Sequence, residues 1–238
     1  SLTNMTAIFE NYESPWMDDE LSILRDAAHR FFSTEFVPHK DRWIEQGKVD
    51  RDAWHKAGEA GLLCAEIPAE YGGGGGDYRH ETIVTEEQLG AGISGFGNQV
   101  HSQIVAPYLL HYGNEEQKQK WLPKMATGEM VGAIAMTEPN TGSDLQNVKT
   151  SATKKGDSYV INGAKTYITN GIHADLVVLV AKTDPNLGAK GISLIIVEAN
   201  TKGFNKGRNL KKLGLNSGDT AELFFDDCVV PRANLLGS

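Results

Sequence analysis

The sequence predicts an α+β chain with two parts: an all-α helical bundle over residues 1–131, then an antiparallel β-barrel or sandwich over residues 132–238. Apolar residues recur at three- and four-residue steps up to about residue 130, and short strand-like runs follow. No long helical segment separates these runs, which argues against a doubly wound parallel sheet. A length of 238 residues is comfortable for two domains.

The first predicted helix begins at Asp18, where three successive acids suit a helix N-terminus. Leu21, Leu24 and Ala28 then recur at helical spacing. Proline lacks a backbone N–H, so Pro38 is expected to end this helix.

Later helices carry their own start and stop signals. Asp50 can cap a short helix that ends near Gly61. The five glycines of residues 72–76 permit no regular element, so a loop is predicted there. A capped start is predicted at Asn114–Gln117, with Trp121 on the buried face of the helix that follows.

The period of the pattern changes near Val131, where runs of β-branched and aromatic residues begin. Turn residues such as Gly156 and Gly203 separate these runs, and such spacing is typical of a sandwich or barrel. In chain order, the predicted strands are Val131–Met136, Val148–Ala152, Tyr159–Ile168, Leu176–Ala181, Ile192–Val197 and Ala221–Val230.

Charge is unevenly distributed along the chain, whose net charge is −8. Residues 1–132 hold 11 basic and 21 acidic side chains, and residues 133–238 hold 12 and 10. The second part is therefore the better host for a phosphate-bearing ligand. The basic stretch Lys202–Lys212 is expected to be a solvated loop, with a phosphate contact as the alternative.

Composition excludes several classes of protein. The net negative charge argues against nucleic acid as the main partner, and no apolar run approaches the ~20 residues of a membrane span. Residues 1–13 lack a signal-peptide core and an Arg-rich transit pattern. Cys64 and Cys228 cannot form a disulfide framework, so a reducing cytoplasm is expected. The seven histidines show no metal-ligand spacing, so no metal site is expected.

Two loops at the tips of predicted strands carry the strongest functional signal. Thr137–Asp144 combines hydroxyl groups with a turn whose backbone N–H groups can bind an anionic or carbonyl-rich ligand. Tyr167–Gly171 adds an aromatic face beside another hydroxyl group. A flat ring with polar edges and a phosphate tail would use both loops. Taken alone, the first loop is equally compatible with an ordinary hairpin.

Together these segments resemble the flavin-binding signature of the acyl-CoA dehydrogenases. In that family a strand leads into Thr-Glu, a small-residue turn and Gly-Ser-Asp, and an Asn-Gly, Lys, aromatic, Ile, Thr/Ser, Asn, Gly run follows. Tyr167 stands where Trp is frequent. The likeness covers nearly the whole chain, and its last stretch is closest to the long-chain members. It also rests on Ile67–Gly73, Tyr112–Lys118, Trp121–Pro123, Leu213–Asn216, Asp219–Asp227, Val230–Pro231 and Asn234–Gly237.

The resemblance implies FAD as the cofactor. Met136 and Thr137 would hydrogen-bond to the pyrimidine part of the flavin. Tyr167 would pack against the flavin ring, and Thr169 would hydrogen-bond near the reactive N5. The implied cofactor contacts are Ile134, Ala135, Met136, Thr137, Gly142, Ser143, Tyr167, Ile168 and Thr169, and the implied substrate contacts are Ser143 and Thr183.

The family also implies a reaction, the α,β-dehydrogenation of an acyl-CoA thioester to a trans-2-enoyl-CoA. Electrons would pass to an electron-transfer flavoprotein, and the full-length protein would be a homo-oligomer, a dimer or a tetramer. Family members continue into a C-terminal four-helix bundle that carries the catalytic carboxylate. No acid of this sequence matches that base, so no catalytic residue is assigned and the chain alone is expected to be inactive.

Two alternatives stay open. An acyl-CoA oxidase or a flavin monooxygenase relative would use the same scaffold with different access for oxygen. A non-catalytic module that binds acyl-CoA or partner subunits is the alternative from a different class. Flavin absorbance bands in the purified chain would distinguish a cofactor site from such a module.

Overall fold

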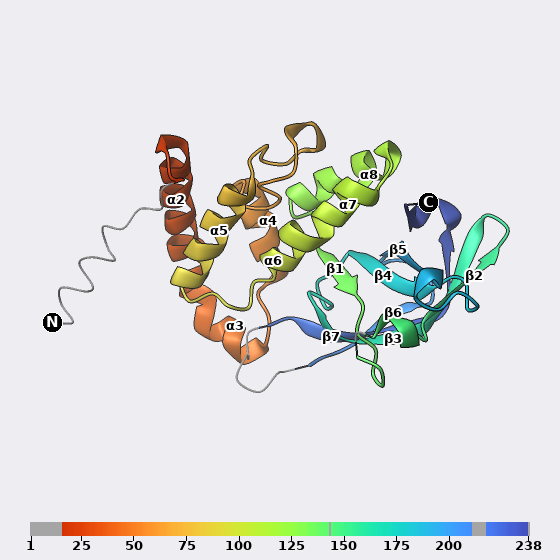
Figure 1. The fold of residues 1–238 in the computed structure, drawn as a ribbon. Coiled ribbons are helices and arrows are strands. Elements are labelled where there is room, and N and C mark those ends of the chain that lie inside the picture. Colours follow the sequence, from red (N-terminus) through yellow and green to blue (C-terminus); the bar gives the residue numbers. More distant parts are fainter. Residues whose placement is uncertain (1–15, 143, 211–217, 238) are drawn as a thin grey trace.

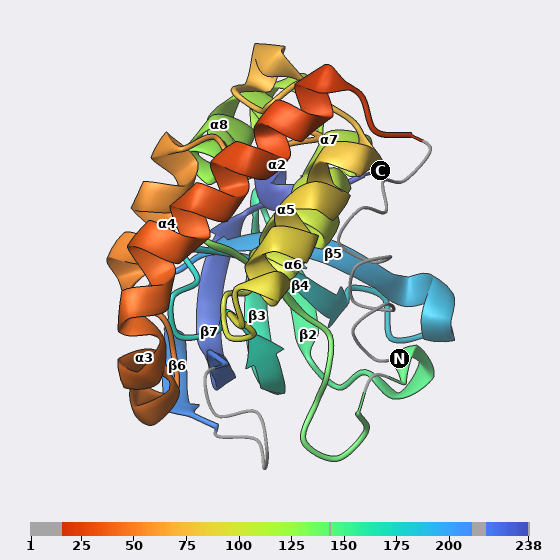
Figure 2. The same cartoon turned by 90° about the vertical axis from the view of Figure 1, so that its left-hand side faces the viewer.

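The computed structural model describes residues 16–142, 144–210 and 218–237. Helices occupy the first part of the chain and strands the second, which confirms the predicted order of the two parts (Figure 1). Figures 1 and 2 show the helices grouped on one side of the sheet. None of the helices in the described ranges is long and apolar enough to span a membrane.

The helical part has an aromatic core. The Phe36 ring lies at its centre, and its centroid is 5.1 Å from that of Trp43 and 5.0 Å from that of Phe96. Edge-to-face contacts of this kind add to the burial of apolar area. The helices are α2 (Asp19–Phe31), α3 (Lys40–Gln46), α4 (Arg51–Glu59), α5 (Tyr78–Gly90), α6 (Asn98–Val100), α7 (Ala106–Tyr112) and α8 (Glu115–Ala126).

The start of α2 is as predicted, but its end is not. The Asp18 side chain accepts the N–H of Leu21 at 2.8 Å and so caps the helix. The prediction that Pro38 ends the helix is wrong. The chain continues through a π-helical turn, Phe32–Phe36, and a 3-10 turn, Val37–His39, into α3. Pro38 fits there because it lies in the first turn, where a missing N–H removes no helical hydrogen bond.

The two other predicted caps have opposite outcomes. Asp50 precedes α4 but caps no helical N–H, because the Arg42 guanidinium binds its carboxylate at 2.6 and 2.8 Å. At α8 the capping box is present: the Asn114 side chain accepts the Gln117 N–H, and the Gln117 side chain accepts the Asn114 N–H. Trp121 is 1% exposed, as predicted.

The strands form one sheet with the order β6-β7-β3-β2-β4-β5-β8, and β1 pairs with β4. Their positions follow the predicted runs, with β6 and β8 in addition. The strands are β1 (Gly132–Ala135), β2 (Ser151–Lys155), β3 (Ser158–Thr169), β4 (Leu176–Lys182), β5 (Ile192–Glu198), β6 (Phe204–Asn209), β7 (Thr220–Pro231) and β8 (Leu235–Leu236).

The sheet is mixed, so the prediction of purely antiparallel strands is wrong in this respect. β1 runs parallel to β4, with Gly132 opposite Leu176, and β2 meets β4 in parallel at Ser151 and Lys182. Parallel neighbours need a long connection, and here the β2–β3 hairpin lies within the connection from β1 to β4.

Strand β4 is buried on both faces and joins the two parts of the molecule. Val177 and Leu179 enter the core inside the curved sheet. Leu176 and Val178 face the other way and pack with Trp121 of α8 and its neighbours. Successive side chains of a strand point to opposite faces, so β4 holds the helices against the sheet.

The basic stretch Lys202–Lys212 is not simply a solvated loop. Its middle forms β6, and Lys206 donates hydrogen bonds to the carbonyls of Ile172 and Ala174 at 2.6 Å each. Residues 211 and 212 lie outside the described residues. The lysine at position 206 therefore anchors the turn that follows β3.

Candidate functional site

A buried ion pair holds the loop that follows β1. Lys165 Nζ lies 3.0 Å from a carboxylate oxygen of Glu138, and the two side chains are 0% and 5% exposed. Glu138 also accepts the backbone N–H groups of Lys149 and Thr150 at 2.8 and 3.0 Å. Burial raises the pKa of Glu138, but these donors outweigh it and bring the pKa down to about 2.

A β-bulge at the end of β3 turns the Tyr167 ring outward. The pairing of β3 with β7 shifts register between Lys165 and Ile168. Tyr167 takes a left-handed conformation, with φ +55°, and is 58% exposed. Ile168 is 2% exposed and returns to the core. An extra residue in one strand re-aims side chains in this way.

The structure brings the two predicted loops together. The Thr166 N–H donates to the Thr137 carbonyl at 2.8 Å, and Lys165 Nζ donates to the Met136 carbonyl at 3.1 Å. Within the described ranges, the hydroxyl groups of Thr137 and Thr169 have no hydrogen-bond partner. They are therefore free to bind a ligand beside the Tyr167 ring.

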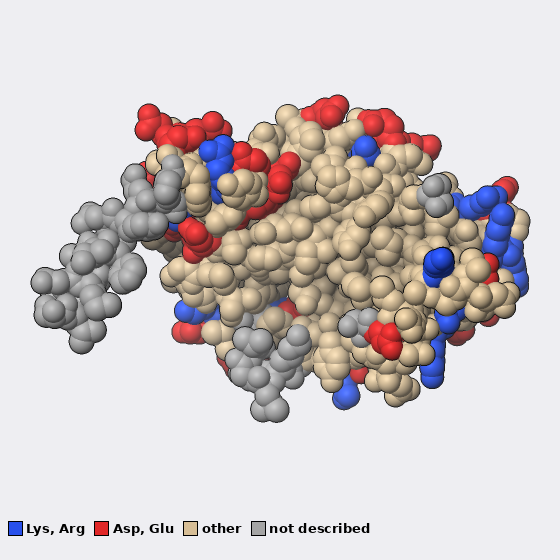
Figure 3. Space-filling model, in the orientation of Figure 1, with Lys and Arg blue, Asp and Glu red and all other residues tan. Residues whose placement is uncertain are grey.

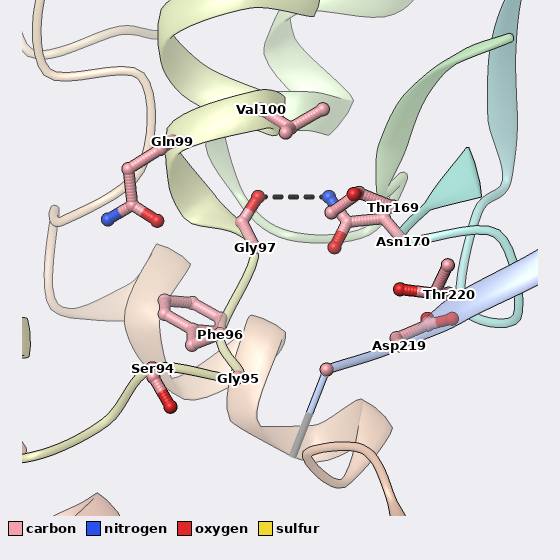
Figure 4. A pocket seen from close by; sticks show the side chains of 11 residues that line it. Ser94, Gly95, Phe96, Gly97, Gln99, Val100, Thr169, Asn170, Asp219 and Thr220 are labelled. Carbon is pink, nitrogen blue, oxygen red and sulfur yellow. Dashed lines mark hydrogen bonds between the residues drawn. The ribbon is translucent and has the colours of Figure 1, made fainter. Parts of the chain in front are cut away.

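A cavity of about 190 Å³ adjoins the second loop (Figure 4). Thr169 and Asn170 line one side, the segment 94–100 lines the opposite side, and residues 218–220 complete it. Asn170 Nδ2 donates to the Gly97 carbonyl at 2.9 Å, which ties the two sides together. A side chain at Gly97 would collide with the Asn170 amide, so only glycine permits this approach.

Asp219 closes the turn after β3. Its two carboxylate oxygens accept the N–H groups of Ile172 and His173 at 2.8 Å each. Burial nevertheless raises the pKa of Asp219 above its ordinary value. Both oxygens are occupied, so Asp219 stabilises the turn and offers no free carboxylate to the cavity.

His101 connects the helices to the start of β1. Its Nδ1 accepts the Gly132 N–H at 2.9 Å, and Nε2 donates to the Met125 carbonyl at 2.9 Å. Burial lowers the pKa of His101 to about 4, so the ring is neutral. A neutral ring can accept at one nitrogen and donate at the other, and both contacts need that form.

Several predicted contacts are less accessible. Ile134 is half-buried against the helices, and Ala135 is fully buried, like Ile168, so neither Ala135 nor Ile168 exposes a side chain. The Gly142 N–H donates to the Glu138 carbonyl at 3.1 Å and is used within its own turn. Ser143 lies outside the described residues.

Thr183 directly follows the end of β4. Its hydroxyl group donates to the Gly191 carbonyl at 3.0 Å and lies 2.7 Å from the Ser193 hydroxyl. These bonds occupy the group that the sequence offers to the substrate. Thr183 therefore contrasts with Thr137 and Thr169, whose hydroxyl groups have no such partners.

Sequence reasoning missed the Glu138–Lys165 pair and the roles of Asn170 and Asp219. The sequence does indicate that Lys165 is buried. Lys165 lies an even number of residues after Tyr159 and Ile161 in the same strand, and both of these side chains are buried. A lysine on the inner side of a strand needs a buried partner. No local pattern identifies Glu138 as the partner, because it lies 27 residues before Lys165 in the sequence.

The described residues contain no group of three or more His, Cys, Asp or Glu side chains that could hold a metal ion. Cys64 and Cys228 are both buried and unpaired. Burial raises the pKa of the Cys228 thiol to about 11. The groups available for chemistry at the site are thus hydroxyls, backbone groups and one aromatic ring.

Comparison with known proteins identifies relatives of both the helical part and the β part of the chain. Residues 18–129 match the acyl-CoA dehydrogenase N-terminal domain, and residues 133–228 match the acyl-CoA dehydrogenase middle domain. The long-chain specific acyl-CoA dehydrogenase of Sus scrofa mitochondria is 48% identical over 220 residues, which are 92% of this chain and 51% of that protein. This chain therefore spans about half the length of that relative.

Solved structures agree with the sequence matches. The acyl-CoA dehydrogenase of Geobacillus kaustophilus superposes with a TM-score of 0.91 at 49% identity, over 95% of this chain and 60% of that one. A glutaryl-CoA dehydrogenase of Mycobacterium smegmatis, in complex with FADH2, gives a TM-score of 0.84 at 30% identity, over 93% and 56%.

Proposed function

This chain belongs to the acyl-CoA dehydrogenase family, and we propose that its two strand-tip loops bind the flavin of FAD in an enzyme that dehydrogenates acyl-CoA thioesters. One observation carries the proposal: the exposed Tyr167 ring lies beside loops whose Thr137 and Thr169 hydroxyl groups have no partner in the described part of the chain. A ring face and free hydroxyl groups suit a flat ligand with polar edges.

Each part of the site has a proposed role. Tyr167 packs against the flavin ring, and Thr137 with the Met136–Thr137 backbone binds its pyrimidine edge. Thr169 binds near N5, on the side that faces the cavity. FAD, when bound, accepts the hydride from the substrate β-carbon. The protein's own groups orient both partners and stabilise the charge that develops.

The remaining contacts follow from position. Gly142 lies at the turn of the first loop, and Ser143 is proposed to meet the phosphate tail of the cofactor or the CoA chain. The N–H of Gly142 is already used in the turn, so its proposed contribution is the close approach of a residue without a side chain. Ile134, Ala135 and Ile168 would contribute backbone groups. Thr183 would contact CoA only if it gave up its present hydrogen bonds.

The 238-residue chain by itself is proposed to be inactive. Three acids lie near the site, and all are engaged: Glu138 with Lys165, Asp144 with Gln146 and Asn147, and Asp219 with two backbone N–H groups. None is proposed to remove the α-proton of a thioester. The substrate acyl-CoA, an electron-transfer flavoprotein as acceptor and a homo-oligomeric dimer or tetramer are proposed for the whole protein.

A reducing compartment is proposed as the location, because both cysteines are buried and unpaired. Of such compartments we favour the cytoplasm. The pig relative carries the word mitochondrial in its name, so localisation of a tagged chain in its own cells is the test. Retention in an organelle would contradict the cytoplasmic assignment.

Flavin titration tests the proposed cofactor site. The purified chain should acquire flavin absorbance bands when FAD is added, and Tyr167→Ala should weaken FAD binding about tenfold through lost ring contact. Tyr78→Ala is the matched control, since Tyr78 is 61% exposed but lies in the helical part. Absence of flavin bands, with acyl-CoA still bound, would favour the non-catalytic module. Rapid reoxidation of the reduced flavin by oxygen would favour an oxidase or monooxygenase.

A further inference from the structure

The ammonium group of Lys165 lies directly against one peptide bond of the proposed flavin loop. Lys165 Nζ is 3.1 Å from the Met136 carbonyl oxygen and 3.0 Å from Glu138. The Lys165 side chain is 0% exposed. A charged donor in such a dry environment polarises the group that it binds more strongly than in water.

The geometry of the peptide bond carries this effect to the opposite side. The described residues contain no cis peptide bond, so the Thr137 N–H points away from the Met136 carbonyl, and hence away from Lys165. No residue in the described ranges accepts a hydrogen bond from the Thr137 N–H. The Thr137 carbonyl is held separately by the Thr166 N–H. The Met136–Thr137 peptide is therefore fixed from one side, with its N–H left for a ligand.

We propose that Lys165 is a positioning residue: it orients and polarises the Met136–Thr137 peptide, so that the Thr137 N–H is a strengthened donor to the flavin ring. The inference rests on the proposed function, because it needs the flavin on this loop. A donor aimed at the pyrimidine edge stabilises the negative charge that gathers there on reduction. Lys165 therefore favours the reduced flavin over the oxidised one.

Glu138 has the complementary role of keeping the ammonium group charged. Burial lowers the pKa of Lys165, and Glu138 counteracts this shift. Glu138 Oε2 accepts hydrogen bonds from both Lys165 Nζ and the Thr150 N–H, and Oε1 accepts the Lys149 N–H at 2.8 Å. Glutamine at position 138 keeps one accepting oxygen, which can still bind the Thr150 N–H and Lys165, while its NH2 group replaces the oxygen that binds Lys149. The change therefore removes the anion next to Lys165 together with one backbone hydrogen bond.

Two variants give shifts of opposite sign. Lys165→Met, made together with Glu138→Gln to avoid a lone buried acid, should reduce the preference for reduced over oxidised flavin about tenfold. This corresponds to a reduction potential about 30 mV more negative. Glu138→Gln alone, measured at pH 6.5, removes the counter-charge and should move the potential in the positive direction. A merely structural role for the pair predicts no such reversal.

Lys206→Met is the matched control, because it removes another lysine that donates to backbone carbonyls, those of Ile172 and Ala174. It should leave the potential unchanged. The alternative is that the reduction potential responds to the loss of any lysine in the β part. Equal shifts of the potential in the Lys206→Met variant and in the Lys165→Met, Glu138→Gln variant would show this and overturn the proposal. Shifts of the same sign in the Glu138→Gln and double variants would also overturn it.

A ligand-free readout separates this inference from the cofactor proposal. In the apoprotein, the amide proton resonance of Thr137 should move upfield in the Lys165→Met, Glu138→Gln variant, because the polarising charge is lost. An unchanged Thr137 resonance overturns the inference whether or not FAD binds. Failure of the wild-type chain to bind FAD overturns the proposed function instead, and the Thr137 measurement then stands alone.

Discussion

Glu81 of α5 is a buried acid with an incomplete set of hydrogen bonds. It is 2% exposed, and one carboxylate oxygen accepts the Glu66 N–H at 3.2 Å. The other oxygen has no partner among the residues described. Burial raises the pKa of Glu81 from 4.5 to about 7. Between pH 4.5 and about 7, Glu81 is therefore protonated in the folded chain and ionised in the unfolded chain.

Glu81 should make the chain less stable as the pH rises. Between pH 4.5 and 7 the unfolded state loses the proton first, so the free energy of unfolding should fall by about 3 kcal/mol. Glu81→Gln should remove this loss and raise stability at pH 8 but not at pH 4.5, as measured by urea unfolding. Glu59→Gln, at an exposed position of α4, is the control. Equal stability of wild type and Glu81→Gln at pH 8 would contradict the assignment.

His101 should give the opposite pH dependence. Its pKa in the fold is about 4 against an ordinary 6.5, so the unfolded chain takes up a proton first as the pH falls. This should lower the free energy of unfolding by about 3 kcal/mol between pH 6.5 and 4. His101→Leu should lack this slope, and it should also cost about 2–5 kcal/mol at pH 7 because two buried backbone groups lose their partner. Wild type and variant with parallel pH profiles would refute this role.

At the scale of elements, α8 is tied to the end of the described chain through the glutamine of its capping box. Gln117 Nε2 donates to the carbonyls of Ala233 and Leu235 at 2.8 Å each, while its oxygen accepts the Asn114 N–H. One side chain therefore completes a helix start and anchors the short strand β8. The capping signature is visible in the sequence, but the link to residues 233–235 is not.

Gln117→Ala should destabilise the chain by about 1–3 kcal/mol, because it removes two partly buried hydrogen bonds to backbone carbonyls. It should also speed amide hydrogen exchange in Leu235 and Leu236 more than elsewhere in the sheet. Asn114→Ala is the matched control, since it removes the cap, at a cost of about 1 kcal/mol, and leaves the bonds to Ala233 and Leu235. If both variants speed exchange at Leu235 equally, the anchoring role is wrong.

The bulge in β3 shows how one element serves both core and site. Without the register shift after Lys165, strict alternation would keep Tyr167 on the inward parity of Lys165 and would turn Ile168 outward. The extra residue lets the buried lysine, the exposed ring and the buried isoleucine follow one another closely. The bulge in β3 therefore determines where the Tyr167 ring, the proposed contact to the flavin, lies.

At the scale of the whole molecule, the helical part and the β part differ in surface charge and are joined by polar contacts. Figure 3 shows acidic side chains along the edge of the helical part, basic ones at the far end of the sheet and a broad uncharged band between them. Polar contacts join the two parts near the site: Arg51 lies 2.9 Å from Asp175, and His173 donates to the Val49 carbonyl at 2.6 Å. These contacts join the start of α4 and the segment before it to the turn after β3 and the start of β4.

The isolated chain, saturated with FAD, should not reduce an acceptor dye with acyl-CoAs of several lengths. A positioned general base contributes about 100- to 10,000-fold to such a reaction, and the acids near the site, Glu138, Asp144 and Asp219, are all engaged in other contacts. The Glu138→Gln and Asp219→Asn variants control for weak use of these acids and should leave the background rate unchanged. Turnover like that of a complete dehydrogenase would reveal a base within residues 1–238.

Local signals in the sequence determined the class of each element. The change from helical to strand-like spacing near Val131, the cap at Asn114 and the burial of Trp121 each depend on neighbours a few residues apart. The same holds for the two strand-tip loops, whose hydroxyl, glycine and aromatic residues occupy adjacent positions. Periodicity and capping can be predicted from sequence because their free energies arise within one or two turns of chain.

Tertiary structure alone decided which distant segments meet. The parallel pairing of β1 with β4, the partner of Lys165 and the use of Asp219 to close the turn after β3 all join residues far apart in the chain. Such outcomes depend on which of many polar groups packing brings within 3 Å, and a buried charge accepts whichever partner the fold supplies.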